Sequence, residues 1–181
     1  MDCEANCGTY RGGLILTDKD VFCEHIRQCE GAMYALALSI VRNTADAADV
    51  LSESICRAFK NLDTLKRDSS FRPWILRIVH NTAVEMIRKN AKILSVEDFV
   101  EEADVGRENI ENKMTEKLAL HDAVAQLQTP YRTVVVLFYF ENLSVSEIAK
   151  ITGTNTAAVK KQLSRARKML REILQEDFTN A

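Results

Sequence analysis

The feature that most constrains this chain is the spacing of apolar residues in its last quarter. Five of them follow one another at steps of 4, 3, 4 and 4 residues, namely Val159, Leu163, Ala166, Leu170 and Leu174. Such steps place side chains on one face of an α-helix. Similar spacing recurs within residues 20–42, 44–62, 72–90 and 118–139, and the 181 residues include two prolines and six glycines. The sequence therefore predicts an all-α protein.

An acidic segment divides the chain into two parts. Between Val96 and Glu111 there are seven acidic residues against one basic residue, Arg107, and no sustained helical stripe. A segment of this composition buries too little apolar surface to order itself. We expect two small helical domains, residues 19–92 and 114–176, joined by a flexible acidic linker at residues 93–113. Residues 1–18 are expected to be a disordered extension.

Three places inside the expected domains bear on where helices begin and end. Residues 20–42 are compatible with one helix or two, and Gly31 is a candidate break between them. Pro73 costs no hydrogen bond in the first turn of a helix, so the third helix is expected from Arg72 to about Asn90. The apolar run 134–140 could pass for a strand when taken alone, but its helical neighbours favour a helix.

The sequence lacks the signals of an exported or membrane-spanning chain. No run approaches the roughly 20 apolar residues that cross a bilayer. The first residues also lack the basic-then-apolar order of a secretory signal. We therefore expect a cytoplasmic protein whose five cysteines are free thiols.

The N-terminal part contains side chains of the types that bind zinc. They are Cys3, Cys7, Cys23, His25 and Cys29. Their spacings do not match those of a compact zinc site, so we expect no metal and no other cofactor. The simpler interpretation is that Cys23, Cys29 and Cys56 fill the core as small apolar residues, while Cys3 and Cys7 lie in the disordered extension.

Residues 144–174 have the pattern of a helix-turn-helix. Ser144 and Glu147 have the spacing of a capping box, which marks the start of a helix. Ala149 lies four residues before Gly153, and this pair allows two helices to approach closely across a tight turn. The helix that follows begins at Asn155 or Thr156, and residues 155–171 contain basic residues but no acidic ones.

A basic helix after such a turn is typical of a recognition helix that enters the major groove of DNA. The alternative is a basic face that is merely solvated. We expect base contacts from Arg165 above all, and phosphate contacts from Arg167 and Arg171. The full set of expected DNA contacts in this helix is Thr156, Lys160, Lys161, Ser164, Arg165, Arg167 and Arg171.

These motifs resemble the extracytoplasmic-function, or group four, sigma factors of the sigma-70 family. The resemblance covers about residues 20–92 and 114–175, which correspond to the family's region 2 and region 4. LSVSEIAKITGTNTAAVKKQLSRARKMLR is similar to the helix-turn-helix of region 4. DAADVLSESICRAFKNL and FRPWILRIVHNTAVEMIRKN are similar to the parts of region 2 that bind the polymerase clamp and melt the promoter.

The resemblance implies a sigma factor that binds core RNA polymerase, directs promoter-specific initiation and catalyses nothing. Region 4 would read the minus-35 element with the recognition helix. The implied contacts to the clamp of the β′ subunit are Asp49, Leu51, Ser52 and Glu53. The implied minus-10 contacts are Lys66, Arg67, Asp68, Ser69, Phe71, Arg77, His80, Asn81 and Arg88. Trp74 is expected in the core, beside Pro73, rather than on a base.

The resemblance also implies the partners. They are promoter DNA, core RNA polymerase through its β′ clamp and β flap, and an anti-sigma factor that could hold the protein at the membrane; no small-molecule substrate is implied. Two rival functions stay open. One is a stand-alone regulator in which residues 20–92 bind a ligand or dimerise, and the other is a scaffold whose basic helix binds an acidic protein surface.

Overall fold

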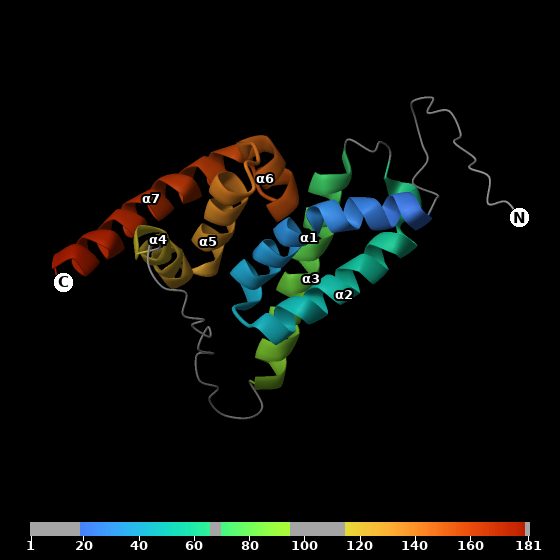
Figure 1. Ribbon diagram of the computed structural model, residues 1–181, viewed down its shortest axis with the longest axis horizontal. Coiled ribbons are helices and arrows are strands. Elements are labelled where there is room, and N and C mark those ends of the chain that lie inside the picture. The colour runs from blue at the N-terminus through green and yellow to red at the C-terminus, as the bar shows by residue number, and fades with distance from the viewer. Residues whose placement is uncertain (1–18, 66–69, 95–114, 180–181) are drawn as a thin grey trace, which may run out of the picture.

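The computed structural model describes residues 19–65, 70–94 and 115–179 (Figure 1). These residues form helices joined by short turns and contain no strand, which confirms the all-α prediction. None of the described helices has the length and hydrophobicity needed to span a bilayer. In chain order the elements are α1 (Lys19–Val41), α2 (Thr44–Lys60), η1 (Leu62–Thr64), α3 (Phe71–Leu94), α4 (Thr115–Gln126), α5 (Thr129–Val135), η3 (Val136–Phe140), α6 (Val145–Thr152) and α7 (Thr156–Thr179).

The helices α1, α2 and α3 pack around a core in which Met33, Leu36 and Ile75 are fully buried. The helix α1 continues through Gly31, so the alternative of a single helix holds for this stretch. Packing of the long apolar face of α1 on α2 and α3 outweighs the roughly 1 kcal/mol that one glycine costs a helix.

The helix α2 begins after Asn43, whose side-chain oxygen accepts hydrogen bonds from the backbone N–H of Ala45 and Asp46 at 2.8 and 3.2 Å.

The second half of the chain comprises α4, α5, η3, α6 and α7. Residues 129–140 are helical throughout, so the strand alternative is wrong and the helix prediction is confirmed. The last turns widen into a π-helix at Val136–Phe140. Such turns are rare and occur mostly as single insertions in α-helices. Here the π-helix leaves Tyr139 and Phe140 exposed while Leu137 stays buried.

The helix-turn-helix forms as the local sequence predicts. The hydroxyl of Ser144 accepts a hydrogen bond from the backbone N–H of Glu147 at 3.3 Å, and the Glu147 carboxylate accepts one from the backbone N–H of Ser144 at 2.9 Å. Gly153 ends α6 in the left-handed conformation with φ of 66°, which glycine adopts without steric cost. The side chain of Asn155 then accepts from the backbone N–H of Ala158 at 2.8 Å, and α7 begins at Thr156.

The two halves of the chain share one hydrophobic core. Leu137 and Ile148 from the second half lie in the same buried cluster as Met33 and Leu76 from the first. The helix α5 packs against α1, and α6 packs against α3 (Figure 1). The sequence predicts the two helical units, but it does not predict that they close on each other. The helix α3 extends to Leu94, and the rest of the expected linker lies outside the described residues.

The cysteines are only partly where the sequence suggests. Cys29 is buried as expected, whereas Cys23 and Cys56 are exposed, so their assignment to the core is wrong. Both lie on outward faces of helices whose other sides carry the apolar stripe. Cys3 and Cys7, with the rest of residues 1–18, lie outside the described residues. Within the described residues no group of three or more potential metal ligands converges.

The capping box should contribute measurably to stability. We expect Ser144→Ala to lower the free energy of unfolding by about 1 kcal/mol, because the backbone N–H of Glu147 in the first turn of α6 loses its acceptor. Urea denaturation measures the change. Ser146→Ala, an exposed serine in the same turn, is the matched control and should change stability by less than about 0.5 kcal/mol. Equal effects of the two variants would contradict the assignment.

Candidate DNA and polymerase interfaces

The helix α7 separates an apolar face from a basic one. Val159, Leu163, Ala166 and Leu170 are buried against the other helices of the second half. Every residue of α7 that the sequence predicts to contact DNA is exposed. Within the described residues, no ion pair engages Lys160, Lys161 or Arg165. The positive charge of this face is therefore free to meet phosphate.

The basic residues of α7 divide into two groups. Lys161, Ser164 and Arg165 lie opposite the buried stripe, where a DNA groove can reach them. Arg167 and Arg171 lie one helical turn apart on a flank, beside a groove of about 590 Å³ between α4, η3 and α7. The Nε of Arg167 donates to the carbonyl of Leu163 at 3.2 Å. The two arginines can thus serve the edge of the DNA surface and the rim of this groove.

The groove beside α7 is a feature that the sequence did not predict. It is lined mainly by apolar side chains, among them Leu120, Tyr139 and Phe140, which are 41%, 49% and 39% exposed. Exposed apolar residues that are grouped on one surface mark sites of protein association. The π-helix Val136–Phe140 presents two of the three. A single-sequence search for periodicity places these side chains in the core and so misses the groove.

In the first half, α3 presents its expected DNA contacts on one outward face. Arg77, Asn81 and Arg88 are exposed and recur at steps of four and seven residues. His80 is set apart from them, because it is half-buried on the flank of the helix. Burial lowers its pKa, although a hydrogen bond with the Asn81 side chain at 3.4 Å acts in the opposite direction. His80 is therefore neutral at pH 7 and adds no charge for phosphate.

Phe71, one of the implied minus-10 contacts, lies in the core of this structure and not on its surface. Phe71 is 2% exposed and packs against the rings of Phe22, His25 and Trp74 at centroid distances of 6.0, 4.9 and 5.7 Å. The reason is that α3 begins at Phe71, so the residue belongs to the first turn of a core helix and not to the preceding loop. Trp74 packs beside it, as expected. Lys66, Arg67, Asp68 and Ser69 lie outside the described residues.

The expected polymerase contacts lie along the outward face of α2. Asp49, Ser52 and Glu53 are exposed, and Leu51 is half-buried. The structure adds Phe59 to this face, where it is 47% exposed. Its ring makes an edge-on contact with Phe22 of the core, at a ring-centroid distance of 5.6 Å.

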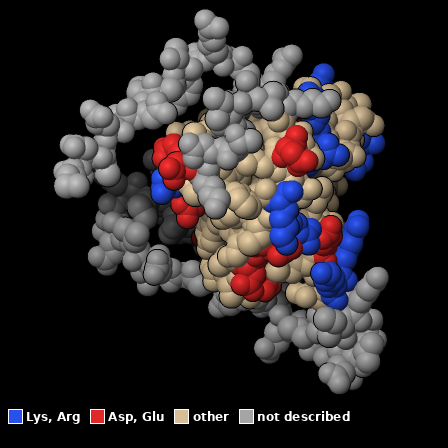
Figure 2. All heavy atoms as spheres, turned by 90° about the vertical axis from the view of Figure 1, so that its right-hand side faces the viewer, with Lys and Arg blue, Asp and Glu red and all other residues tan. Residues whose placement is uncertain are grey.

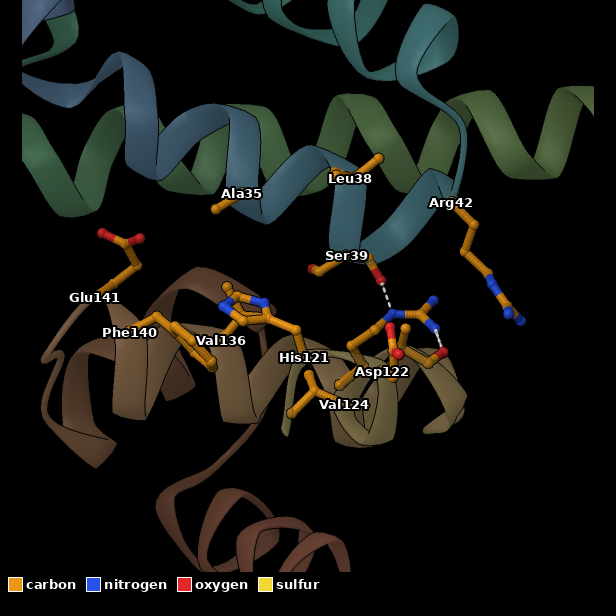
Figure 3. A pocket seen from close by; sticks show the side chains of 12 residues that line it. Ala35, Leu38, Ser39, Arg42, His121, Asp122, Val124, Val136, Phe140 and Glu141 are labelled. Atoms are coloured by element: carbon orange, nitrogen blue, oxygen red, sulfur yellow. Dashed lines mark hydrogen bonds between the residues drawn. The ribbon is translucent and has the colours of Figure 1, made fainter. Parts of the chain in front are cut away.

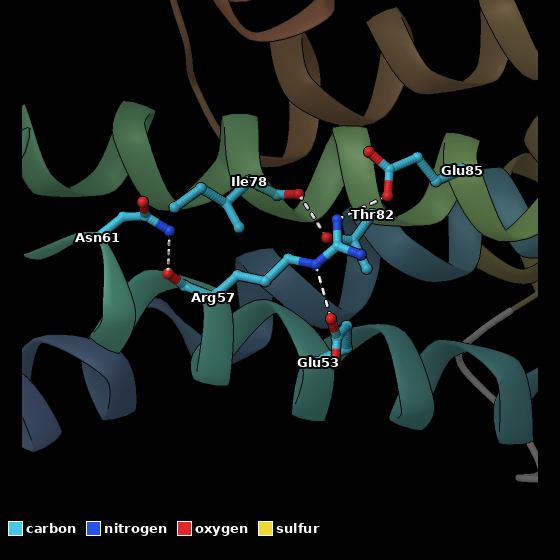
Figure 4. A network of polar contacts seen from close by, with 6 residues as sticks. All are labelled: Glu53, Arg57, Asn61, Ile78, Thr82 and Glu85. Atoms are coloured by element: carbon cyan, nitrogen blue, oxygen red, sulfur yellow. Dashed lines mark hydrogen bonds and ion pairs between the residues drawn. The ribbon is translucent and has the colours of Figure 1, made fainter.

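An arginine bridge fixes this face relative to α3 (Figure 4). The Nε of Arg57 donates to the Glu53 carboxylate and its terminal nitrogen donates to the Glu85 carboxylate, both at 2.7 Å. The hydrogen bond from Arg57 lowers the pKa of Glu53, and the two carboxylates raise the pKa of Arg57. Because the pairs are partly exposed, their main effect is to orient Glu53, with a modest contribution to stability.

Charges of both signs are mixed on the end of the molecule built from α1, α2 and the start of α3. Figure 2 shows basic and acidic side chains side by side on this face. The visible part of this face is therefore mixed in sign, whereas residues 155–171 of α7 include basic residues and no acidic ones.

A second groove, of about 530 Å³, opens between the two halves. Figure 3 shows Ala35 and Leu38 of α1 on one side and His121, Val124 and Phe140 on the other. Its two ends differ in charge, with Arg42 at one end and Glu141 at the other (Figure 3). The groove exists only because α1 packs against α5 and η3. No pattern in the sequence indicates it.

Comparison with known proteins identifies the family. The family model "Sigma-70 region 2" matches residues 25–93, and "Sigma-70, region 4" matches residues 117–170. RNA polymerase sigma factor SigV of Bacillus subtilis is 37% identical over 148 residues, which cover 81% of this chain and 87% of SigV. This chain belongs to the sigma-70 family of RNA polymerase sigma factors. The ECF RNA polymerase sigma factor SigW of the same organism is 27% identical over 88% of this chain and 91% of SigW, which agrees with the extracytoplasmic-function group.

Solved structures show the same fold. The sigma factor RpoE, in complex with the anti-sigma factor NepR from Bartonella quintana, superposes with a TM-score of 0.74 at 21% identity, covering 86% of this chain and 98% of RpoE. CnrH, in complex with the cytosolic domain of CnrY, gives a TM-score of 0.64 at 23% identity, covering 88% of this chain and 91% of CnrH. The helices α1 to α3 are referred to below as region 2, and α4 to α7 as region 4.

The half-buried position of His80 can be tested by titration. We expect the imidazole of His80 to titrate below the ordinary value of about 6.5, because burial disfavours its charged form. As the pH falls through that value the unfolded chain takes up the proton first, so the folded state loses stability. NMR spectra of the imidazole protons give the midpoint, with His80→Gln to assign the signal. A midpoint at or above 6.5 would show that the ring is solvated.

Proposed function

We propose that this sigma factor binds core RNA polymerase and directs it to promoters by reading the minus-35 element with the outward face of α7. The observation that carries the proposal is a capped helix after a left-handed glycine turn whose Lys160, Lys161 and Arg165 are exposed and make no ion pair within the described residues. A helix in this setting fits the major groove, and its N-terminal turns present side chains to base edges. Like other sigma factors, the protein is not itself catalytic.

The contacts of α7 fall into three roles. Arg165 is the candidate for a bidentate base contact, since its long planar side chain is exposed opposite the buried stripe. Thr156, Lys160, Lys161 and Ser164 lie on the same N-terminal half of the helix and contact bases or adjacent phosphates. Arg167 and Arg171, on the flank, contact phosphate at the edge of the site.

In region 2, the outward face of α3 contacts the minus-10 element through Arg77, Asn81 and Arg88. Their exposure on one side of a helix supports this assignment. The neutral, half-buried His80 takes a smaller part, as an uncharged hydrogen-bonding group at the edge of the face. Lys66, Arg67, Asp68 and Ser69, which lie outside the described residues, keep their predicted role in capturing a base, and this role rests on the family resemblance alone.

Two surfaces serve the polymerase. The outward face of α2, with Asp49, Ser52 and the oriented Glu53, docks on the clamp of the β′ subunit, and Phe59 supplies an exposed apolar anchor there. The groove of about 590 Å³ on region 4 receives an apolar segment of the β flap. Its exposed Leu120, Tyr139 and Phe140 and its basic rim suit a helix with an apolar face and acidic flanks.

An anti-sigma factor controls the protein in this proposal. RpoE and CnrH, which share its fold, were solved with NepR and with the cytosolic domain of CnrY. The groove of about 530 Å³ between region 2 and region 4 offers apolar side chains from both halves to such a partner. A partner bound in this groove would also hinder the binding of the protein to the polymerase. We expect the protein to act in the cytoplasm, and at the membrane when an anti-sigma factor holds it there.

The proposal is tested by run-off transcription with purified core polymerase and genomic DNA fragments from the source organism. We expect new start sites that require both proteins and that weaken with Arg165→Ala by about 1–3 kcal/mol in promoter binding. Arg27→Ala, an exposed arginine of α1 outside the proposed surfaces, is the control and should initiate as the wild type does.

The same assay separates the rival functions. Tight, specific DNA binding without polymerase-dependent initiation would favour a stand-alone regulator. Absence of both DNA binding and initiation would favour the scaffold.

If the protein acts as a sigma factor, Lys161→Ala should weaken binding to all promoters alike, because one phosphate contact is lost. The same variant should reduce the slope of log affinity against log salt concentration by about 1.

A further inference from the structure

Arg57 is a half-buried cation shared between α2 and α3 (Figure 4). Its Nε donates to the Glu53 carboxylate one turn earlier on α2, and its terminal nitrogen donates to the Glu85 carboxylate on α3, both at 2.7 Å. A glutamate four residues before an arginine is the favourable order for an ion pair within a helix. The second pair crosses from α2 to α3. A single guanidinium therefore holds one carboxylate on each helix.

The backbone of Arg57 is held as well as its side chain. Its carbonyl accepts hydrogen bonds from the backbone N–H of Asn61 at 3.1 Å and from the side-chain amide of Asn61 at 2.7 Å. Asn61 is the C-cap of α2, so the arginine side chain starts from a fixed turn of the helix. The planar guanidinium also loses little freedom for each hydrogen bond that it forms. Both carboxylates are thereby pre-organised.

The two ion pairs are too exposed to act mainly as stabilising contacts. The side chains of Glu53 and Glu85 are 53% and 49% exposed, and that of Arg57 is 33% exposed. Pairs of this kind add little to stability, because water screens the charges and ordering long side chains costs entropy. Within the described residues one oxygen of each carboxylate is hydrogen-bonded, so the other is accessible to a partner.

The two carboxylates lie on different functional surfaces. Glu53 is one of the predicted clamp contacts on α2. Glu85 lies four residues after Asn81 and three residues before Arg88, and so on the side of α3 that carries the expected minus-10 contacts. An uncompensated carboxylate there would repel the phosphates of DNA. Within the described residues, Arg57 is the cation that pairs with Glu85.

We propose that Arg57 serves both interfaces of region 2, because it holds the Glu53 carboxylate in the position from which it contacts the polymerase clamp and neutralises Glu85 beside the minus-10 contacts. It is a positioning residue that acts through these two carboxylates. The inference rests on the proposed function, which supplies the two interfaces. The hydrogen bond from Arg57 also lowers the pKa of Glu53, which keeps this carboxylate ionised for a basic partner.

The charges allow the two roles to be separated. The Arg57–Glu85 pair is neutral overall, and Arg57→Ala leaves an unmatched negative charge beside the minus-10 contacts. Adding Glu85→Gln replaces the pair by two neutral side chains, which restores the charge balance of that surface. The double variant still lacks the hydrogen bond to Glu53. It should therefore repair the DNA interface and leave the polymerase interface impaired.

The test measures the two interfaces separately with the full-length protein. Titration of the fluorescently labelled protein with purified core polymerase gives the first affinity. Binding of a promoter fragment recovered in the run-off assay, at a core concentration that saturates every variant, gives the second. The variants are Glu53→Gln, Arg57→Ala, Glu85→Gln, and Arg57→Ala combined with each of the other two, with Arg27→Ala, which breaks an exposed pair within α1, as the control. Circular dichroism verifies that each variant is folded.

We expect Arg57→Ala to weaken core binding about two- to fivefold, the range of an exposed ion pair. It should weaken promoter binding by a similar factor and reduce the slope of log affinity against log salt concentration by up to about 1. Adding Glu85→Gln should restore promoter binding and its slope but not core binding. In the Glu53→Gln background, Arg57→Ala should weaken core binding no further. The control should match the wild type in both assays.

Other outcomes would overturn the inference at identifiable points. A bridge with a structural role alone would weaken both affinities together, and neither double variant would separate them. Losses of core binding that add in full for Arg57→Ala and Glu53→Gln would show that Arg57 does not act through Glu53. Promoter binding that weakens with Glu85→Gln alone would show that this carboxylate contacts DNA itself. Arg57→Ala without effect in either assay would exclude both roles.

Failure of the proposed function gives a different result. If Glu53→Gln leaves core binding unchanged, Glu53 is not a clamp contact, and the promoter measurements still decide whether Arg57 neutralises Glu85. If the wild type itself does not bind core polymerase, the proposed function is wrong and the inference falls with it.

Discussion

The packing of α5 and α6 against α1 and α3 is the contact on which the rest of the structure depends. It unites side chains as distant in sequence as Met33 and Ile148 in one buried cluster. It also sets the position of the helix-turn-helix relative to region 2 and creates the groove between the halves. Without it the chain would be two small helical units, each with an apolar face open to water. The shared core therefore determines both the shape of the free protein and the surfaces it offers.

The parts of the fold that sequence reasoning predicted are those governed by local physics. Ser144 and Glu147 satisfy each other's backbone groups three residues apart, and Gly153 adopts the left-handed conformation at the end of the same short helix. The stripe from Val159 to Leu170 follows from helical periodicity alone. The seven expected contacts of α7 are all exposed for the same reason, since residues that avoid the stripe must lie on the other side.

What could not be predicted depends on partners that are distant in sequence. The sequence places Phe71 just before the expected third helix, yet the rings of Phe22 and His25 of α1 pack against it. Phe59 fits the apolar period of α2, yet no neighbouring element covers it fully. Arg132 looks like any charged residue in a helix, and its burial requires a carbonyl 93 positions earlier. Helical spacing predicts which residues share one face of a helix, but the tertiary arrangement decides which residues that face contacts.

The arginine at position 132 does what an apolar residue could not do there. An apolar side chain of similar volume would fill the interface without the cost of desolvating a charge, and such replacements often stabilise a closed form. It would also leave the carbonyls of Ser39 and Ala125 without this donor. A guanidinium satisfies them only in one geometry, with its Nε directed at α1 and a terminal nitrogen directed at α4. The same residue thus makes the packing of α1 and α4 around it specific to the geometry in which it reaches both carbonyls.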